Sequence, residues 1–562
     1  MKISRRDFLK DIAIFGAAQP FIAPYIITGK KTNSELDILI KGGFVVDGSG
    51  NPGKKSDIGV KGNRIRYIGP ECKLSSDRII KADNLTVAPG FIDVHTHTDI
   101  ELLVVPSGGS KLMQGVTTEI GGNCGSSIAP RSYEEDDDYR KNIKNRYGFE
   151  ADWTNFSQFF NKLKKNKIGI NFCTFLGLGT IRSEVIGNED RPPTASEMEK
   201  MKNMTKTAME EGVFGISTGL EYVPSSFATE DEIAELAKVA AGYNGVYATH
   251  IRNEDDTLEE AVTEALNVAK KANISLQISH LKACREKNWY KVEKILKQIH
   301  SEKEKGVNVD FDRYPYTAYS TGLANLFPIW SREGGTRKFI ERLNDGSLTE
   351  KIKETVLYKV ENTGSWNSFM ITSVKEEKNK RYQGKTIKEI SEKFDFDPYE
   401  FTRNLIIEEH NRVGIVGFAM SEENTRAVLS DPLCIIGSDG AVLSTSGPLS
   451  KGNPHPRNYG TFPRAIGKYA RKDKIFSLEE VIRKITSAPA RKFNIINRGM
   501  LTEGFYADIV IFDYNKIIDK ADYSNPHQYP EGINFVVVNG KIVAEKNEPT
   551  GELPGMILKL NG

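Results

Sequence analysis

The 562-residue sequence predicts an α/β fold, a TIM (β/α)8 barrel that carries a small β-sandwich built from both chain ends and an inserted small domain. Three observations lead to this prediction. Short alternating apolar runs separated by Gly and Asn occupy both ends of the chain. Strand patterns alternate with amphipathic helical patterns through the middle of the chain. One connection between two of those strands is too long for a single crossover.

Both ends of the chain have the pattern of β-strands. Residues 36–41 and 64–68 alternate apolar and polar side chains near the N-terminus, and residues 507–512 repeat this pattern near the C-terminus. We therefore expect residues 34–88 and 490–562 to form one β-sandwich domain.

The middle of the chain, residues 89–489, has the alternation typical of a barrel. Amphipathic stretches such as residues 257–272 and 289–303 separate the strand candidates. The eight strand candidates are residues 91–97, 116–124, 169–176, 213–220, 245–250, 274–280, 307–313 and 433–439. Because the seventh connection is so long, we expect residues of about 333–415 to form the inserted small domain.

Charge and cysteine content exclude several classes of protein. Lys and Arg number 77 and Asp and Glu number 75, which gives a net charge of +2 and argues against a nucleic-acid partner. Five cysteines in 562 residues exclude a disulfide scaffold. Without an uninterrupted apolar run of 18 residues, the sequence predicts no conventional membrane-spanning helix.

The first 33 residues have the layout of an export signal. The run SRRDFLK at residues 4–10 precedes a moderately apolar stretch, residues 12–27, and resembles the bacterial twin-arginine signal. The alternative is an ordinary amphipathic first helix, which Pro20 and Pro24 would interrupt. We expect an exported, periplasmic protein that meets the membrane only in transit through the twin-arginine system.

Histidines stand where barrel chemistry is expected. His95 and His97 close the first strand candidate, and side chains two residues apart on a strand point to the same side. In a TIM barrel the reactive groups lie at the carboxyl ends of the strands. Two neighbouring neutral imidazoles there suit a divalent metal such as zinc.

Four further residues end other strand candidates. Cys124 ends the second, His250 the fifth, His280 the sixth and Asp439 the eighth. Taken singly, each has an ordinary explanation: a hydrogen-bonded histidine, an inert thiol between glycines or an aspartate in a turn. Their coincidence with the histidine pair at one barrel mouth predicts a metal centre.

Several motifs resemble those of one enzyme superfamily. The run PGFIDVHTH at residues 89–97 resembles the opening signature of the amidohydrolase superfamily. Many binuclear members carry a carbamylated Lys on the fourth strand, whereas residues 215–222 hold no Lys and GGNCG stands at residues 121–125. With the motifs that follow, residues 35–545 are similar to the N-acyl-D-amino-acid deacylase (D-aminoacylase) family. These motifs are THIRNE at 249–254, SHLK at 279–282, YPY at 314–316 and HPRNYGTF at 455–462.

The resemblance implies a zinc site with one tightly bound Zn²⁺ and an adjoining, weaker second position. The first position would use Cys124, His250 and His280, with Cys124 replacing a bridging carboxylate, and the second would use His95, His97 and Asp439.

The same resemblance assigns roles around the metal. Asp439 is the implied proton shuttle, and Tyr314 is the residue implied to polarise the scissile carbonyl. Lys282 and Arg457 match positions that bind the substrate carboxylate, although each is open to the simpler explanation of a surface charge. Ser320 is implied to lie near that carboxylate, and Tyr222 to line the pocket.

These assignments predict hydrolysis of an N-acyl-D-amino acid to a carboxylate and a free D-amino acid. Bound zinc lowers the pKa of water towards about 7, and a nearby carboxylate can move the proton to the leaving amine. Three alternatives stay open. They are a cyclic-amide hydrolase of the dihydropyrimidinase type, whose Lys-bearing metal pattern is missing, a D-residue dipeptidase, and a non-catalytic barrel scaffold, which should have lost metal ligands.

Overall fold

A computed structural model describes residues 34–132 and 138–560. The twin-arginine-type segment, residues 1–33, lies outside the described residues. Within the described ranges, none of the helices has the length and apolar character that crossing a lipid bilayer requires.

Parallel strands form the predicted barrel. They are β6 (Phe91–Asp93), β7 (Val116–Gly121), β8 (Asn171–Thr174), β9 (Leu176–Gly177), β10 (Gly215–Gly219), β11 (Val246–His250), β12 (Ser275–Ile278), β13 (Val309–Arg313) and β17 (Cys434–Ile436). They pair in the orders β6-β7-β8 and β9-β10-β11-β12-β13-β17. Only Phe175 separates β8 from β9, and a parallel bridge between Thr96 and Gly440 joins the chain after β6 to the chain after β17. The ring therefore closes with eight strand positions.

Helices connect these strands and pack on the barrel. They are α1 (Glu101–Val104), α2 (Gly109–Leu112), α3 (Asp138–Tyr147), α4 (Phe156–Asn166), α5 (Leu178–Val185), α6 (Ala195–Glu211), α7 (Glu230–Ala241), α8 (Leu258–Ala272), α9 (Lys291–Glu304), α14 (Glu422–Ser430), α15 (Arg457–Arg464), α16 (Leu478–Ile485) and α17 (Ser487–Lys492). Local sequence fixes their ends: Thr194 and Glu197 form a capping box at the start of α6, and left-handed Gly212 ends it.

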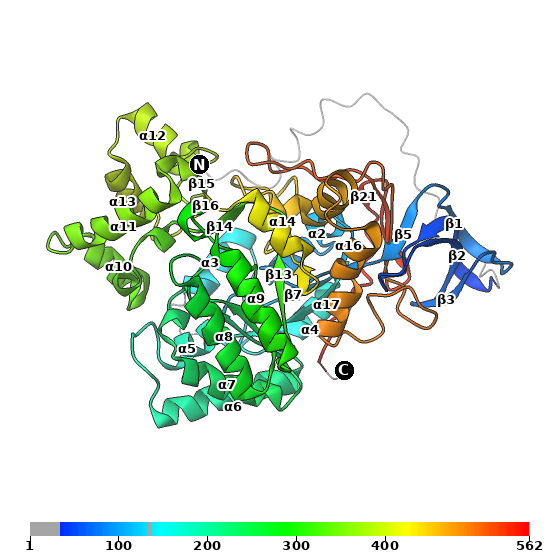
Figure 1. The fold of residues 1–562 in the computed structure, drawn as a ribbon, viewed down its shortest axis with the longest axis horizontal. Coiled ribbons are helices and arrows are strands. Elements are labelled where there is room, and N and C mark those ends of the chain that lie inside the picture. Colours follow the sequence, from blue (N-terminus) through cyan, green and yellow to red (C-terminus); the bar gives the residue numbers. More distant parts are fainter. Residues whose placement is uncertain (1–33, 133–137, 561–562) are drawn as a thin grey trace, which may run out of the picture.

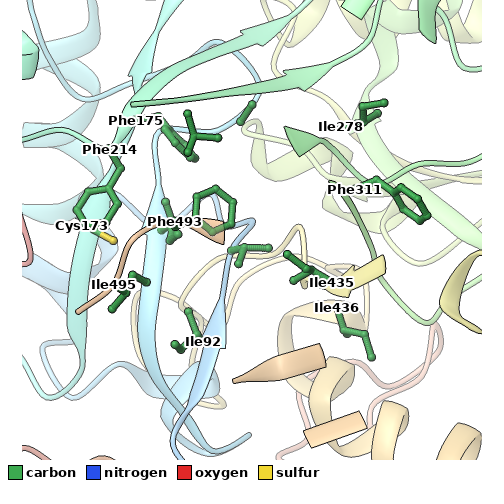
Figure 2. Close-up of a cluster of buried hydrophobic side chains, with 14 of the residues drawn as sticks. Ile92, Cys173, Phe175, Phe214, Ile278, Phe311, Ile435, Ile436, Phe493 and Ile495 are labelled. Carbon is green, nitrogen blue, oxygen red and sulfur yellow. The ribbon is translucent and has the colours of Figure 1, made fainter. Parts of the chain in front are cut away.

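Apolar side chains fill the barrel and its surroundings. Figure 2 shows part of this core, with Ile92 of β6, Phe311 of β13 and Ile436 of β17 among the buried side chains. Phe493 and Ile495, which follow α17, belong to the same core. This packing holds the strands in place, so that the residues just after them occupy fixed positions at the barrel mouth.

Both chain ends contribute to one β-rich part. Its strands are β1 (Leu36–Val45), β2 (Lys54–Lys61), β3 (Arg64–Gly69), β4 (Ser76–Lys81), β5 (Thr86–Pro89), β18 (Ile509–Phe512), β19 (Ile533–Val538), β20 (Lys541–Glu545) and β21 (Glu548–Pro549). They join as one nine-stranded sheet, because β18 pairs with β5. Ile38 and Ile58 from one end share a core with Ile509 and Val537 from the other.

The long connection after β13 forms a substructure of its own in the region where the sequence predicts an insertion. It contains β14 (Ala318–Gly322), α10 (Gly335–Leu343), α11 (Thr349–Thr363), β15 (Phe369–Ser373), α12 (Ile387–Phe394), α13 (Pro398–Glu408) and β16 (Gly414–Phe418). The strands form a separate sheet in the order β14-β16-β15, and Phe327, Val356 and Ile406 belong to a separate core. Since β14 begins at Ala318, this substructure starts earlier than the predicted range of 333–415. In Figure 1 it lies on the opposite side of the barrel from β1, β2 and β3.

Candidate metal centre

The barrel brings all the predicted metal donors together. Their ligand atoms form two groups, and within each group all atoms lie within 4.8 Å of one another. One group consists of His95, His97, Cys124 and Asp439, and the other of Cys124, His250 and His280. The sulfur of Cys124 thus stands between two potential cation positions.

The distances around Cys124 suit tetrahedral zinc. Its Sγ lies 3.8 Å from His250 Nδ1, 3.7 Å from His280 Nε2 and 3.3 Å from His95 Nε2. Bond lengths of about 2.3 Å to sulfur and about 2.0 Å to nitrogen place a sulfur and a nitrogen donor about 3.5 Å apart around one tetrahedral zinc ion. The sulfur and nitrogen donors present therefore fit zinc.

Three of these residues have an uncommon backbone conformation. Cys124, His280 and Asp439 have positive φ angles of 51°, 36° and 52°. Side chains other than glycine rarely adopt this left-handed region, and surrounding contacts must hold them there. Asp312 Oδ1 accepts the His280 backbone N–H at 2.8 Å, and the His95 carbonyl accepts that of Asp439 at 2.8 Å.

A carboxylate lies behind each of three metal-facing imidazoles. The pairs are His280 Nδ1 with Glu254 Oε1 at 2.9 Å, His95 Nδ1 with Asp312 Oδ1 at 3.2 Å, and His250 Nε2 with Glu221 Oε2 at 3.7 Å. Carboxylates in this position favour one orientation of each ring, although His95 Nδ1 and His250 Nε2 form no hydrogen bond in the described part of the chain.

Buried charges keep the central ligands ionised. Burial alone would raise the pKa of the Cys124 thiol, but positive His95 and hydrogen bonds from His250 and His280 outweigh burial, and that pKa falls well below its usual value. Burial also opposes ionisation of Asp439, but Arg457 holds the pKa of that carboxyl well below its usual value. Thiolate and carboxylate are the forms that bind a cation.

A cavity of about 890 Å³ opens above these ligands. The remaining predicted site residues all line it, namely Tyr222, Lys282, Tyr314, Ser320 and Arg457. The insertion supplies the opposite wall through Asn325, Ile329, Arg332, Thr355 and Lys359. The structure therefore gathers the residues predicted for the site around one space, and His95 is the one among them that does not line it.

The cations of the cavity are not surface charges. Lys282 and Arg457 are 4% and 5% exposed. Lys282 forms an ion pair with Glu254 and donates to the His280 carbonyl at 3.0 Å. Its Nζ also lies 2.8 Å from His280 Nδ1, so the three N–H groups of Lys282 have partners within the site.

Two donor atoms of residues that line the cavity have no partner among the described residues. The hydroxyl of Tyr314 and Nε of Arg457 are buried, and neither forms a hydrogen bond with another residue in the described part of the chain. Buried polar groups of this kind are normally satisfied, so both are available to a bound molecule.

Sequence reasoning missed the carboxylates behind the histidines and the cations of the insertion. Glu221 and Glu254 follow β10 and β11 closely, so the strand-end rule that found the histidines applies to them. Asp312 lies within β13 and pairs with His95 only through closure of the barrel. Arg332 and Lys359 belong to the insertion, outside the alternating pattern that located the site.

A histidine and cysteine metal centre at the carboxyl ends of barrel strands defines a metal-dependent hydrolase. Residues 78–312 and 409–544 match the model of the amidohydrolase family, and the unmatched segment between them contains the insertion. The chain belongs to the amidohydrolase family.

Within this family, the chain is similar to several deacylases. The chain is 32% identical to N-acyl-D-glutamate deacylase and 30% identical to D-aminoacylase, both from Alcaligenes xylosoxydans xylosoxydans, with 93% of this chain and 97% of each relative covered. The crystal structure of N-acyl-D-glutamate deacylase from Bordetella bronchiseptica, complexed with zinc and a phosphonate inhibitor, is 30% identical with a TM-score of 0.79. That match covers 93% of this chain and 99% of the other. These matches confirm the resemblance seen in the sequence.

Proposed function

We propose that this protein hydrolyses the amide bond of N-acyl-D-amino acids in a zinc-dependent reaction and releases a carboxylate and a free D-amino acid. One observation carries the proposal. A cysteine sulfur shared by two donor groups lies beside a cavity with unpaired Arg457 and Tyr314 donors. The support from relatives is that the similar proteins are named as deacylases of N-acyl-D-amino acids or as D-aminoacylase.

Zinc is the cation that the donor set suits best. One Zn²⁺ would be held tightly by Cys124, His250 and His280, and a second, weaker position would use His95, His97 and Asp439. Zinc, when bound, supplies a nucleophilic hydroxide near neutral pH and a Lewis acid for the carbonyl.

Asp439 is placed to move the proton. Its Oδ1 lies 2.9 Å from His97 Nε2 and its Oδ2 2.7 Å from Arg457 Nη1. As an anion, Asp439 accepts a proton from the attacking water and then delivers it to the departing amine. Arg457 keeps the carboxylate ionised before the reaction begins.

The unpaired donors orient the substrate. Arg457 Nε binds the α-carboxylate, Lys282 adds its positive charge to the same cavity, and the Tyr314 hydroxyl donates to the scissile carbonyl oxygen as negative charge develops there. Ser320 lies near the carboxylate, and Tyr222 closes the pocket beside His250. Holding the carboxylate fixes which side of the amide meets the nucleophile, and this distinguishes D- from L-substrates.

Turnover of matched substrates by the zinc-loaded protein tests the proposal. We expect release of free amino acid from N-acetyl-D-amino acids and little from their L-enantiomers. Preferential opening of dihydrouracil or hydantoin would favour the cyclic-amide alternative, and preference for D-dipeptides over N-acetyl substrates would favour the dipeptidase. Failure to hydrolyse any of these would leave a non-catalytic barrel and overturn the proposal.

A variant of the proton shuttle tests the mechanism. Asp439→Asn should retain zinc at the tight position and lose turnover by about 100-fold or more, because the amide cannot accept the proton. Zinc content and kcat of the purified variant provide the measurement. Undiminished kcat would remove Asp439 from the mechanism.

We also propose export through the twin-arginine system to the periplasm. The support is the SRRDFLK run at residues 4–10 and the apolar stretch at residues 12–27. Replacing Arg5 and Arg6 by Lys should leave the protein in the cytoplasm of a bacterial host with this system, as detected by cell fractionation. Unchanged export would contradict the proposal.

A further inference from the structure

A fully buried lysine lies beneath the metal centre and takes no part in the proposed chemistry. Lys111, in α2, is 0% exposed. Its Nζ lies 2.7 Å from Asp93 Oδ2 and 3.0 Å from Glu119 Oε1, both of which are also fully buried. Burying an ammonium group is costly unless each of its N–H groups has a hydrogen-bond acceptor. The acceptors of Lys111 therefore identify the segments that this cation holds in place.

Two contacts of Lys111 lie on either side of Asp439. Its Nζ donates to Ser438 Oγ at 2.7 Å and to the Gly440 carbonyl at 3.2 Å. Ser438 Oγ in turn accepts the Gly440 backbone N–H at 3.0 Å. Asp439, between these two residues, has the left-handed φ of 52°. Lys111 therefore fixes the chain on both sides of a strained aspartate.

The same cluster ties Asp439 to the histidine pair. Asp93 Oδ1 accepts the backbone N–H groups of Ser438 at 2.9 Å and of His95 at 3.4 Å. The His97 backbone N–H donates to the Gly440 carbonyl at 2.9 Å, which is the carbonyl that Lys111 also contacts. Lys111 thus joins the chain after β6 to the chain after β17.

We propose that Lys111 is a positioning residue for the deacylation, which holds Asp439 in the conformation that brings its carboxylate to His97 and Arg457. This inference rests on the proposed function of Asp439 as the proton shuttle. Because a displacement of about 1 Å at a reacting group can cost about 100-fold in rate, the effect of losing Lys111 should appear in kcat.

The chain offers a matched control at the other end of the barrel. Lys492 is also buried, with its Nζ 3.0 Å from Asp310 Oδ2 and 2.7 Å from the Leu276 carbonyl. These contacts lie near the starts of β12 and β13, away from the catalytic mouth. Lys492→Met removes a comparable buried cation and should leave kcat unchanged within about twofold.

The test compares Lys111→Met, Lys492→Met, Asp439→Asn and the double variant Lys111→Met/Asp439→Asn as zinc-loaded proteins. Zinc content, thermal unfolding, kcat and KM are measured with an N-acetyl-D-amino acid. We expect Lys111→Met to keep its zinc at Cys124, to lower kcat by about 100-fold and to change KM less than about threefold. In the Asp439→Asn background, the same substitution should cause no further loss of kcat.

Either of two results would overturn the inference. One is a folded Lys111→Met variant with kcat within about twofold of the unsubstituted protein, and the other is a full additional loss in the double variant. Full turnover by Asp439→Asn alone would instead overturn the shuttle role and thereby this inference.

A second variant covers the case in which Lys111→Met does not fold. Ser438→Ala removes one Lys111 contact without removing the cation, and should lower kcat by about tenfold only when Asp439 is present. Unchanged kcat in folded Ser438→Ala would then count against the inference.

Discussion

At the scale of single residues, Cys124 determines the character of the metal centre. Its sulfur belongs to both donor groups, so a thiolate stands between the two cation positions where a carboxylate oxygen could otherwise stand. Thiolates bind zinc well. The three imidazoles around Cys124 also lower the pKa of its thiol, although burial opposes this. Metal affinity and thiol ionisation therefore depend on the same contacts.

Removal of this sulfur should abolish tight metal binding. We expect Cys124→Ala to bind zinc at least about 100-fold more weakly and to lose turnover, because two imidazoles alone remain at the tight position. Cys173→Ala, which changes a buried thiol in β8 outside both donor groups, should retain both properties. Competition with a chromophoric chelator measures the affinity, and stoichiometric zinc in Cys124→Ala would contradict the assignment.

Glu254 should contribute to affinity without touching the metal. Its Oε1 lies 2.9 Å from His280 Nδ1 and also pairs with Lys282. Glu254→Gln should weaken zinc binding by about 10- to 100-fold, since the imidazole loses its anionic partner. Glu259→Gln, on the exposed side of α8, is the control and should bind zinc normally. Equal affinities in the two variants would show that Glu254 does not tune His280.

At the scale of elements, the insertion completes the cavity that the barrel begins. Arg332 lies in the 3-10 turn Ile329–Arg332, faces the cavity and is 9% exposed. Its Nη2 lies 3.5 Å from the Glu221 carbonyl oxygen and the charge of Glu221 acts on it, but its Nε makes no hydrogen bond in the described part of the chain. A desolvated guanidinium whose Nε has no hydrogen-bond partner favours a ligand that brings a second negative charge.

The choice of substrate should therefore depend on Arg332. We expect Arg332→Met to lower kcat/KM for N-acetyl-D-glutamate by about 10- to 100-fold, because a hydrogen bond between charged groups contributes about 1.5–3 kcal/mol. The kcat/KM for N-acetyl-D-leucine, which has no side-chain charge, should change by less than about threefold. Arg337→Met, an exposed position in α10, is the control. Equal losses for the two substrates would exclude a role of Arg332 in selecting charge.

At the scale of the whole molecule, regular patterns made the architecture predictable. The period of the strands located the barrel, and the strand-end rule placed His95, His250 and Asp439 at one mouth. Contacts between side chains that are far apart in the sequence could not be predicted in this way. Asp312 and His95 lie 3.2 Å apart although more than 200 residues separate them, and Lys111 belongs to a short helix without a strand-end position. The sequence also placed the start of the insertion too late, because β14 pairs with the distant β16.

Zinc bound by Cys124, His250 and His280 should stabilise the barrel, because these donors follow β7 and β12 or end β11. A ligand that binds only the folded state adds about 2.7 kcal/mol at a free concentration 100 times its Kd. Dialysis against a chelator should therefore lower Tm by several degrees, and added Zn²⁺ should restore it in a concentration-dependent way. Mg²⁺, which prefers oxygen ligands, should not restore it. Identical unfolding curves with and without zinc would show that these three segments do not share a cation.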